Sequence, residues 1–139
     1  MKDSHARSLT KAITWRVLGT LDTIFLAFII TDQLNTAISI GATEVFTKIA
    51  LFYFHERVWN KLLIGRSTTG VKIYRSVIKT VSWRITGTLD TILLTYLFTG
   101  GIGTALSVGA TELFTKMLLY FLHERVWTKV KWGRVEALE

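Results

Sequence analysis

Two short motifs in this chain put acids and bases where they can bind ions or move protons. Glu44 and Lys48 are four residues apart in a mostly apolar stretch, and Asp22 stands in the apolar stretch before it. His55 and Glu56 follow two helical turns after Lys48. Carboxylates and lysines in apolar surroundings relay protons, hold cations or pair with one another, and histidine also binds metals. The candidate chemistry is therefore the handling of protons or ions.

Every one of these residues occurs twice. Residues 8–61 align with 76–129 without a gap at a constant offset of 68, and about half of the aligned positions are identical. This pattern indicates a tandem duplication. It predicts a polar core formed by Asp22, Glu44, Lys48, Asp90, Glu112 and Lys116, with Arg16, Arg84, Thr20 and Thr88 in secondary positions.

The composition indicates a membrane protein. Half of the 139 residues are hydrophobic, the mean hydropathy is +0.37, and the chain contains neither proline nor cysteine. Four apolar runs cover 12–30, 36–58, 80–98 and 104–126, and roughly 20 residues of helix suffice to cross a bilayer. Helix is expected because no water satisfies backbone groups inside the membrane. The absence of cysteine excludes disulfides and cysteine metal sites.

The connectors between the runs set the domain organisation. Residues 31–35 and 99–103 are short, so each repeat should be an antiparallel hairpin. We predict an all-α integral membrane fold with four transmembrane helices, built as two parallel hairpin repeats about a pseudo-twofold axis along the membrane normal. Residues 1–61 form the first repeat, 62–75 a cytoplasmic linker, 76–129 the second repeat, and 130–139 a cytoplasmic tail. The apolar and basic residues of 60–78 suit a helix that lies on the membrane surface.

The lysines and arginines predict the orientation. They precede the first run, lie between the second and third, and follow the fourth, whereas neither hairpin tip contains one. Both termini and the linker should therefore be cytoplasmic. The basic residues that give the net charge of +7 flank the apolar runs and form no stripe interleaved with exposed aromatics. No nucleic-acid partner is therefore expected.

The buried charges need an explanation, because an ionised residue at the bilayer centre costs roughly 2.5–3.5 kcal/mol. Counting from the tips at 1.5 Å per residue puts Asp22 and Glu44 near the midplane. These side chains should therefore face the bundle interior, be paired, or be partly neutralised. Together with Lys48 and Arg16 they sum to zero charge in each repeat, which predicts a mutually compensated polar core. Threonines at 20, 23, 43 and 47 supply further ligands.

Three functions fit this pattern. The first is a channel or transporter-like module that conducts or couples a proton, ion or small solute. The alternative is a structural or accessory membrane protein whose ion pairs drive helix and oligomer assembly, with itself or with a partner membrane protein. The third uses His55 and His123 for a metal or haem, although His-Glu-Arg beside tryptophan at a helix end is more often an interfacial cap. No catalytic or nucleotide-binding motif occurs, so neither an enzyme nor a cofactor is expected.

The motifs also carry a resemblance. His-Glu-Arg-Val-Trp, at 55–59 and 123–127, together with Trp15-Arg16-(x2)-Gly19-Thr20-(x)-Asp22-Thr23, resembles a family of small prokaryotic membrane proteins known only as a domain of unknown function. The resemblance covers nearly all of 8–61 and 76–129, with one hairpin as the family's usual unit. It implies a bacterial inner-membrane protein and no established activity.

Overall fold

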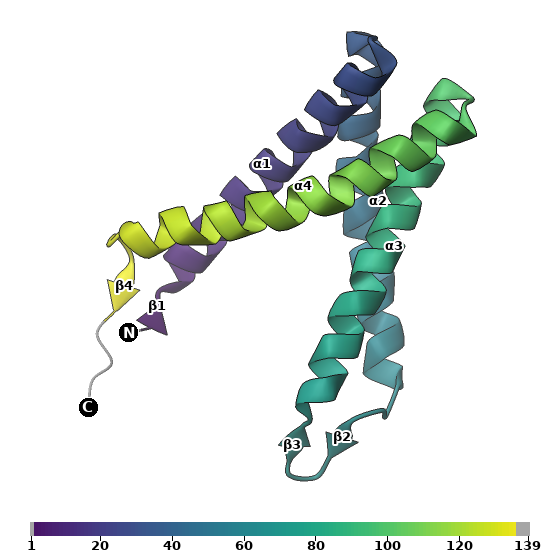
Figure 1. The fold of residues 1–139 in the computed structure, drawn as a ribbon. Helices are drawn as coiled ribbons and strands as arrows, with labels where there is room; N and C mark the ends of the chain where they lie inside the picture. Colours follow the sequence, from purple (N-terminus) through teal and green to yellow (C-terminus); the bar gives the residue numbers. More distant parts are fainter. Residues whose placement is uncertain (1, 136–139) are drawn as a thin grey trace.

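The computed structural model describes residues 2–135 and consists of four long helices (Figure 1). They are α1 (His5–Thr31), α2 (Leu34–Lys61), α3 (Ile73–Thr99) and α4 (Ile102–Lys129). Each contains one of the predicted apolar runs and extends beyond it, mainly toward the charged end. The all-α membrane fold with two hairpin repeats is confirmed. Residues 136–139 of the expected tail lie outside the described residues.

Tight turns close the two hairpins. α1 ends at Asp32, which adopts a left-handed conformation with φ 56°, and α3 ends at the equivalent Gly100 with φ 73°. Their backbone N–H groups donate to Phe28 O and Tyr96 O, both at 2.7 Å. Left-handed C-caps of this kind end many helices because they satisfy a terminal carbonyl. We call the end of the molecule with residues 32–33 and 100–101 the tip end, and the opposite end the base end.

The helices pair differently at the two ends. Toward the base end, α1 runs beside α4 and α2 runs beside α3, and these two pairs splay apart as two legs (Figure 1). Each leg therefore contains one helix from each repeat. Toward the tip end, α1 meets α2 and α3 meets α4, as hairpins require. Each hairpin thus holds its own two helices together at the tip end, and the two legs part toward the base end.

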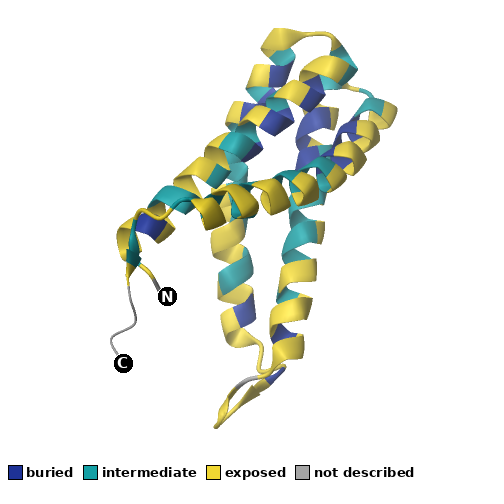
Figure 2. Ribbon diagram, turned by 60° about the vertical axis from the view of Figure 1, so that its left-hand side comes forward, coloured by how far each residue is buried: buried dark blue, intermediate teal, exposed yellow. Residues whose placement is uncertain are grey.

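The core lies in the tip half, where dark blue residues gather in Figure 2. Its buried apolar side chains come from all four helices: Leu26, Ala27, Ala37, Ile40, Leu94, Ala105 and Val108. Small residues allow close approach here. A Cβ built on Gly41 would lie 2.4 Å from Ile24 Cγ1 of α1, and Gly109 stands in the same relation to Ile92 of α3. Glycine is therefore what lets the two helices of each hairpin touch.

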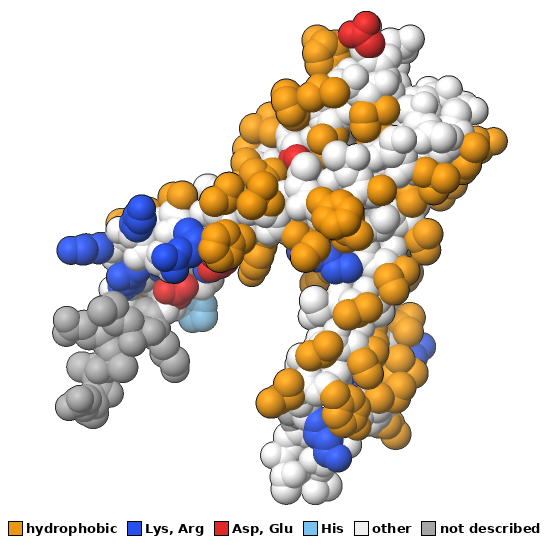
Figure 3. Space-filling view, in the orientation of Figure 1, with side chains coloured by type: hydrophobic (Ala, Val, Ile, Leu, Met, Phe, Trp, Pro, Cys, Tyr) orange, Lys and Arg blue, Asp and Glu red, His pale blue; other side chains and the backbone are white. Residues whose placement is uncertain are grey.

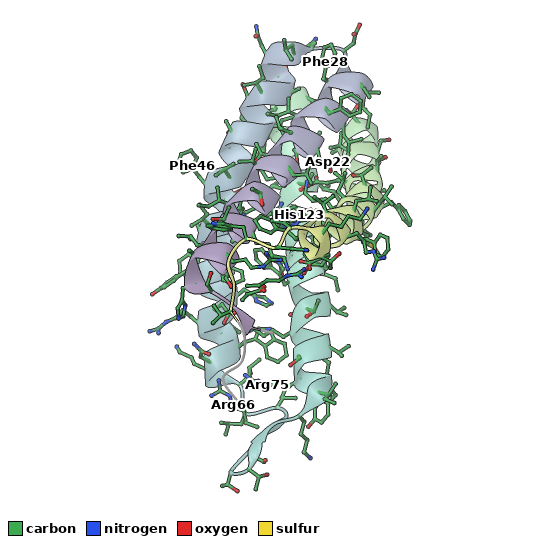
Figure 4. The ribbon with its side chains drawn as sticks, turned by 90° about the vertical axis from the view of Figure 1, so that its left-hand side faces the viewer. Asp22, Phe28, Phe46, Arg66, Arg75 and His123 are labelled. Carbon is green, nitrogen blue, oxygen red and sulfur yellow. The ribbon has the colours of Figure 1, made fainter. Side chains whose placement is uncertain are left out.

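The outer surface is apolar, as expected in lipid. Large hydrophobic side chains cover the face shown in Figure 3, while lysines and arginines gather at the ends of the legs. Phe46 and its equivalent Phe114 are 75% and 72% exposed, and Phe46 points away from the bundle in Figure 4. Such a surface is stable next to hydrocarbon and unstable in water.

Three of the described helices, α1, α2 and α4, are long and apolar enough to cross a membrane. α3 has the same length as α1 but is more polar. It carries Thr86, Thr95 and Tyr96 where α1 has Leu18, Ala27 and Phe28. α3, the fourth predicted span, is thus long enough to cross a membrane, but amino-acid differences from the first repeat lower its hydropathy.

The linker does not form the expected surface helix. Residues 66–71 form a β-hairpin in which β2 (Arg66–Ser67) pairs with β3 (Gly70–Val71). Gly65 with φ 70° and Gly70 with φ 139° permit backbone conformations that a helix cannot contain. An equivalent ladder joins the ends of the chain, where β1 (Lys2–Asp3) pairs with β4 (Arg134–Val135).

Candidate functional site in the polar core

The predicted polar core forms, and Lys48 is at the centre of one half of it. Its Nζ lies 2.6 Å from Glu44 Oε1 on its own helix and 3.3 Å from Asp90 Oδ2 on α3. It also donates to Gly87 O at 2.9 Å and to Thr91 Oγ1 at 3.0 Å. Four acceptors surround three ammonium hydrogens. All three ammonium hydrogens of Lys48 therefore have acceptors within the protein.

Lys116 repeats this arrangement in the other half. Its Nζ lies 2.7 Å from Glu112 Oε1, 3.3 Å from Asp22 Oδ2, 2.9 Å from Gly19 O and 3.0 Å from Thr23 Oγ1. Because Lys116 belongs to α4, it uses the α1 motif of the other repeat. This contact gives part of the motif Gly-Thr-x-Asp-Thr a structural role. Its glycine carbonyl, aspartate and second threonine form the lysine site.

A glycine lies beside each lysine. A Cβ on Gly87 would lie 3.4 Å from Lys48 Cε, and one on Gly19 would lie 3.6 Å from Lys116 Cε. Each lysine stem therefore passes closely over a glycine to reach its carbonyl. Thr47 and Thr115 complete the site by donating to Asp90 Oδ2 at 2.8 Å and to Asp22 Oδ2 at 2.9 Å.

Two carboxylate oxygens at the centre of the core lack partners. Glu44 and Glu112 are 5% and 6% exposed. Their Oε1 atoms bind lysine and accept hydrogen bonds from Thr91 and Thr23, both at 3.1 Å. Their Oε2 atoms are buried without a hydrogen-bond partner among the described residues. Both glutamates line the same cavity.

The core is not neutral. Four carboxylates, those of Asp22, Glu44, Asp90 and Glu112, share two lysines. The sequence analysis expected Arg16 and Arg84 to balance them, and that part of the expectation is wrong. Within residues 2–135, neither guanidinium forms an ion pair. An uncompensated buried carboxylate is costly and favours uptake of a proton or cation.

A cavity of about 500 Å³ opens where the two legs part. Glu44, Glu112, Lys48 and Lys116 lie at its inner end, and all four helices line it. The secondary residues of the sequence analysis line it as well, namely Arg16, Arg84, Thr20 and Thr88, with Trp15 and Trp83. On the tip side, buried apolar side chains lie between the glutamates and the tips. Asp22 and Thr115 of the polar core also line a second, mostly apolar pocket formed by α1, α2 and α4.

The histidines do not meet. His55 packs against α3, where its Nε2 lies 2.7 Å from Ser82 Oγ and its ring 5.5 Å from that of Trp83. His123 packs against α1, 2.9 Å from Thr14 Oγ1 and 5.6 Å from the Trp15 ring. They therefore belong to different legs. No group of three or more His, Cys, Asp or Glu able to hold a metal occurs in the described part of the chain.

Arg7 and Arg75 have a role that the sequence analysis missed. The Arg75 guanidinium is buried, donates to Trp59 O, Leu62 O and Ile64 O at 2.5–2.9 Å, and stacks 5.1 Å over the Trp59 ring. Arg7 binds the end of α4 in the same way. Each arginine satisfies the free carbonyls of the partner helix of its leg. The signal was available, because the two residues extend the 68-residue alignment by one position.

Comparison with known proteins agrees with the duplication. The model of the family described as "Predicted membrane protein (DUF2061)" matches twice, at residues 9–60 and 77–128. These segments cover α1–α2 and α3–α4 nearly in full. No curated protein and no solved structure matches the chain.

Proposed function

We propose that this chain, which belongs to the DUF2061 family of predicted membrane proteins through both of its repeats, is a transporter-like module that carries protons across the membrane. The proton would be held between Glu44 and Glu112. The observation that carries the proposal is the pair of buried Oε2 atoms without partners. One shared proton would give both of them a hydrogen bond and remove one uncompensated charge.

The cavity supports a transporter-like rather than an open-channel mechanism. It gives the glutamate pair access to solvent from the base end. Leu26, Ile40, Leu94 and Val108 are buried between the pair and the tips, so access from that side requires the helices to move. A site open to one side at a time is the arrangement that alternating access uses. The lysines fix the carboxylates in place and keep their Oε1 atoms occupied.

Proton flux into proteoliposomes tests the proposal. A pH-sensitive dye inside the vesicles should report acidification by the wild type under an imposed pH gradient. The double variant Glu44→Gln, Glu112→Gln should abolish this flux, since an amide cannot take up and release the proton. The matched control is Glu56→Gln, Glu124→Gln on the same two helices, where the carboxylates pair with Lys79 and Lys11 at the base end. Wild-type flux through the first double variant would refute the proposal.

A structural role is the second candidate, and one observation favours it. Both interhelical ion pairs of the core, Lys48–Asp90 and Lys116–Asp22, join the first repeat to the second. The polar core therefore also holds the repeats together. If this is its whole role, the wild type should give no flux. Glu44→Lys combined with Lys48→Glu should then recover part of the stability that either single change removes.

We also infer the orientation and setting. The base end, with β2–β3 and both termini, would face the cytoplasm of a bacterium, with the chain in the inner membrane. The basic side chains at the ends of the legs support this orientation. Because the chain has no cysteine, Thr68→Cys and Gln33→Cys can be labelled singly with an impermeant maleimide in spheroplasts. Labelling of the tip variant alone is expected. Assembly as a homo-oligomer would show as a larger particle in detergent.

A further inference from the structure

Six residues that line the cavity carry side-chain hydrogen-bond donors without a partner in residues 2–135. They are the guanidinium groups of Arg16 and Arg84, the indole N–H groups of Trp15 and Trp83, and the hydroxyls of Thr20 and Thr88. The six form three pairs at the 68-residue offset, one member of each pair on α1 and the other on α3. Since α1 and α3 belong to different legs, the two sets of donors approach the cavity from opposite sides.

The rings of Trp15 and Trp83 pack against aromatic residues of the neighbouring helices, but the hydrogen-bond donors of the six side chains have no partner in residues 2–135. In the motif Trp-Arg-x-x-Gly-Thr-x-Asp-Thr, the glycine, aspartate and last threonine bind the lysine of the other repeat. The side chains of its tryptophan, arginine and first threonine make no hydrogen bond among the described residues. The same division holds in the second repeat. One half of the motif therefore builds the core, and the other half presents donors to whatever occupies the cavity.

The charges of the cavity favour an anion near its opening. Four basic residues line it, but Lys48 and Lys116 are already paired with carboxylates of the core. Arg16 and Arg84 are the two that form no ion pair within residues 2–135. The carboxylates of Glu44 and Glu112 lie at the inner end, where the lysines already bind them. The two arginines are nearer the base end and have no anionic partner in the described residues. Guanidinium groups of this kind bind phosphate groups through two parallel hydrogen bonds.

Part of the cavity wall is apolar. Phe52, Tyr120, Val45 and Leu113 line it beside the arginines. The tryptophans place the arginines at the level where aromatic residues meet the headgroups of a bilayer. The legs splay apart toward the base (Figure 1), and we infer that a lipid can enter the cavity between them. An occupant with a phosphate for the arginines and acyl chains for the walls matches both surfaces.

We propose that the cavity between the legs binds an anionic phospholipid, with its phosphate held between Arg16 and Arg84. The proposal is independent of proton carriage by Glu44 and Glu112. Two arginines close to one phosphate predict a preference for anionic over zwitterionic lipid of about 30-fold, the equivalent of about 1 kcal/mol for each basic residue.

Native mass spectrometry of the purified protein measures this preference. The probes are phosphatidylglycerol and phosphatidylcholine with identical acyl chains, titrated in the same detergent. The variant is Arg16→Gln, Arg84→Gln, which should lose the preference for phosphatidylglycerol. The matched control is Arg57→Gln, Arg125→Gln, an exposed pair at the same offset that lies outside the cavity and should keep it. Thermal unfolding in detergent verifies that both variants are folded.

The outcomes separate the lipid from its alternatives. Retention of phosphatidylglycerol by the wild type and the control, and its loss from Arg16→Gln, Arg84→Gln, is the expected result. Equal binding of the two lipids by the wild type would overturn the proposal. Equal loss from both double variants would also overturn it, because the effect would then come from net charge alone. Displacement of bound phosphatidylglycerol by millimolar inorganic phosphate would show a site for free oxyanions and refute the lipid assignment.

Discussion

Lys48 of α2 lies 3.3 Å from Asp90 of α3, across the boundary between the two repeats. Its nearest carboxylate, that of Glu44, comes from its own helix. The lysine thus joins an acid of the first repeat to an acid of the second, and Lys116 does the same in reverse. Each hairpin supplies half of two identical sites, and neither site is complete within one repeat.

Removing this lysine should destabilise the protein strongly. Lys48→Met leaves Glu44 and Asp90 buried without a cation, and breaking a buried ion pair on one side costs roughly 3–5 kcal/mol. Thermal unfolding in detergent, followed by tryptophan fluorescence, should show a large decrease in the melting temperature. Lys61→Met, at the exposed end of the same helix, is the control and should leave it nearly unchanged. Equal melting of the two variants would contradict the assigned role of Lys48.

The contact between the helices of the first hairpin gives a second prediction. Gly41→Ala places a methyl group 2.4 Å from Ile24 Cγ1, and overpacking of this kind costs about 1–3 kcal/mol. Combining it with Ile24→Ala should recover part of that loss, because the space is then free. Gly103→Ala is the control. Its Cβ meets nothing within 4 Å, and alanine favours helix by about 1 kcal/mol over glycine. A melting temperature that falls equally in both single variants would argue against the close contact.

A third prediction concerns the buried arginine at the base of the α2/α3 leg. Arg75→Ala removes hydrogen bonds to three backbone carbonyls at the end of α2 and should destabilise the protein by about 3 kcal/mol or more. Arg75→Lys should restore little, since an ammonium group cannot reach three carbonyls and stack on Trp59 at once. Hydrogen exchange should increase at the end of α2 and not at its start. Full rescue by lysine would mean that charge alone matters there.

Much of the fold could be predicted from the sequence. The 68-residue offset revealed the duplication, and the apolar runs located the four helices. The cost of charge in a membrane required Asp22, Glu44 and Lys48 to face inward, and they do. These inferences succeed because they depend on length, periodicity and the low polarity of the bilayer, which are local properties of the chain.

The pairing of the helices could not be predicted in the same way. Asp22 and Asp90 stand in nearly identical motifs, so sequence gives Lys48 no reason to choose α3 over α1. The choice depends on how the hairpins pack, and it decides that the legs are α1/α4 and α2/α3. The charge balance failed for a related reason. Counting Arg16 with the acids assumed that it reaches them, whereas it lines the cavity nearer the base end.

The two short β-ladders predict that the chain tolerates circular permutation. β1 pairs with β4 in the register Lys2–Val135 and Asp3–Arg134, which is the register of β2 and β3 shifted by 68 residues. In β2–β3 the connection is the dipeptide Thr68-Thr69. Joining Val135 to Lys2 through Thr-Thr and opening the chain between 68 and 69 should therefore recreate the same topology. Its stability should lie within about 1 kcal/mol of the wild type, because loop-closure entropy changes little.

The control opens the chain between Val45 and Phe46 with the same new junction. This cut interrupts α2 inside the Lys48 site, between Glu44 and Lys48, so the permutant should lose its cooperative unfolding transition. The first permutant should keep both the transition and its particle size in detergent. The permutant could fail to fold although substitutions in β1 and β4 of the wild type are tolerated. That result would show that the ends of the chain do not pair as a second copy of the β2–β3 hairpin. If it folds, the molecule is a closed ring of two equivalent hairpins, and the chain ends can lie at either β-ladder.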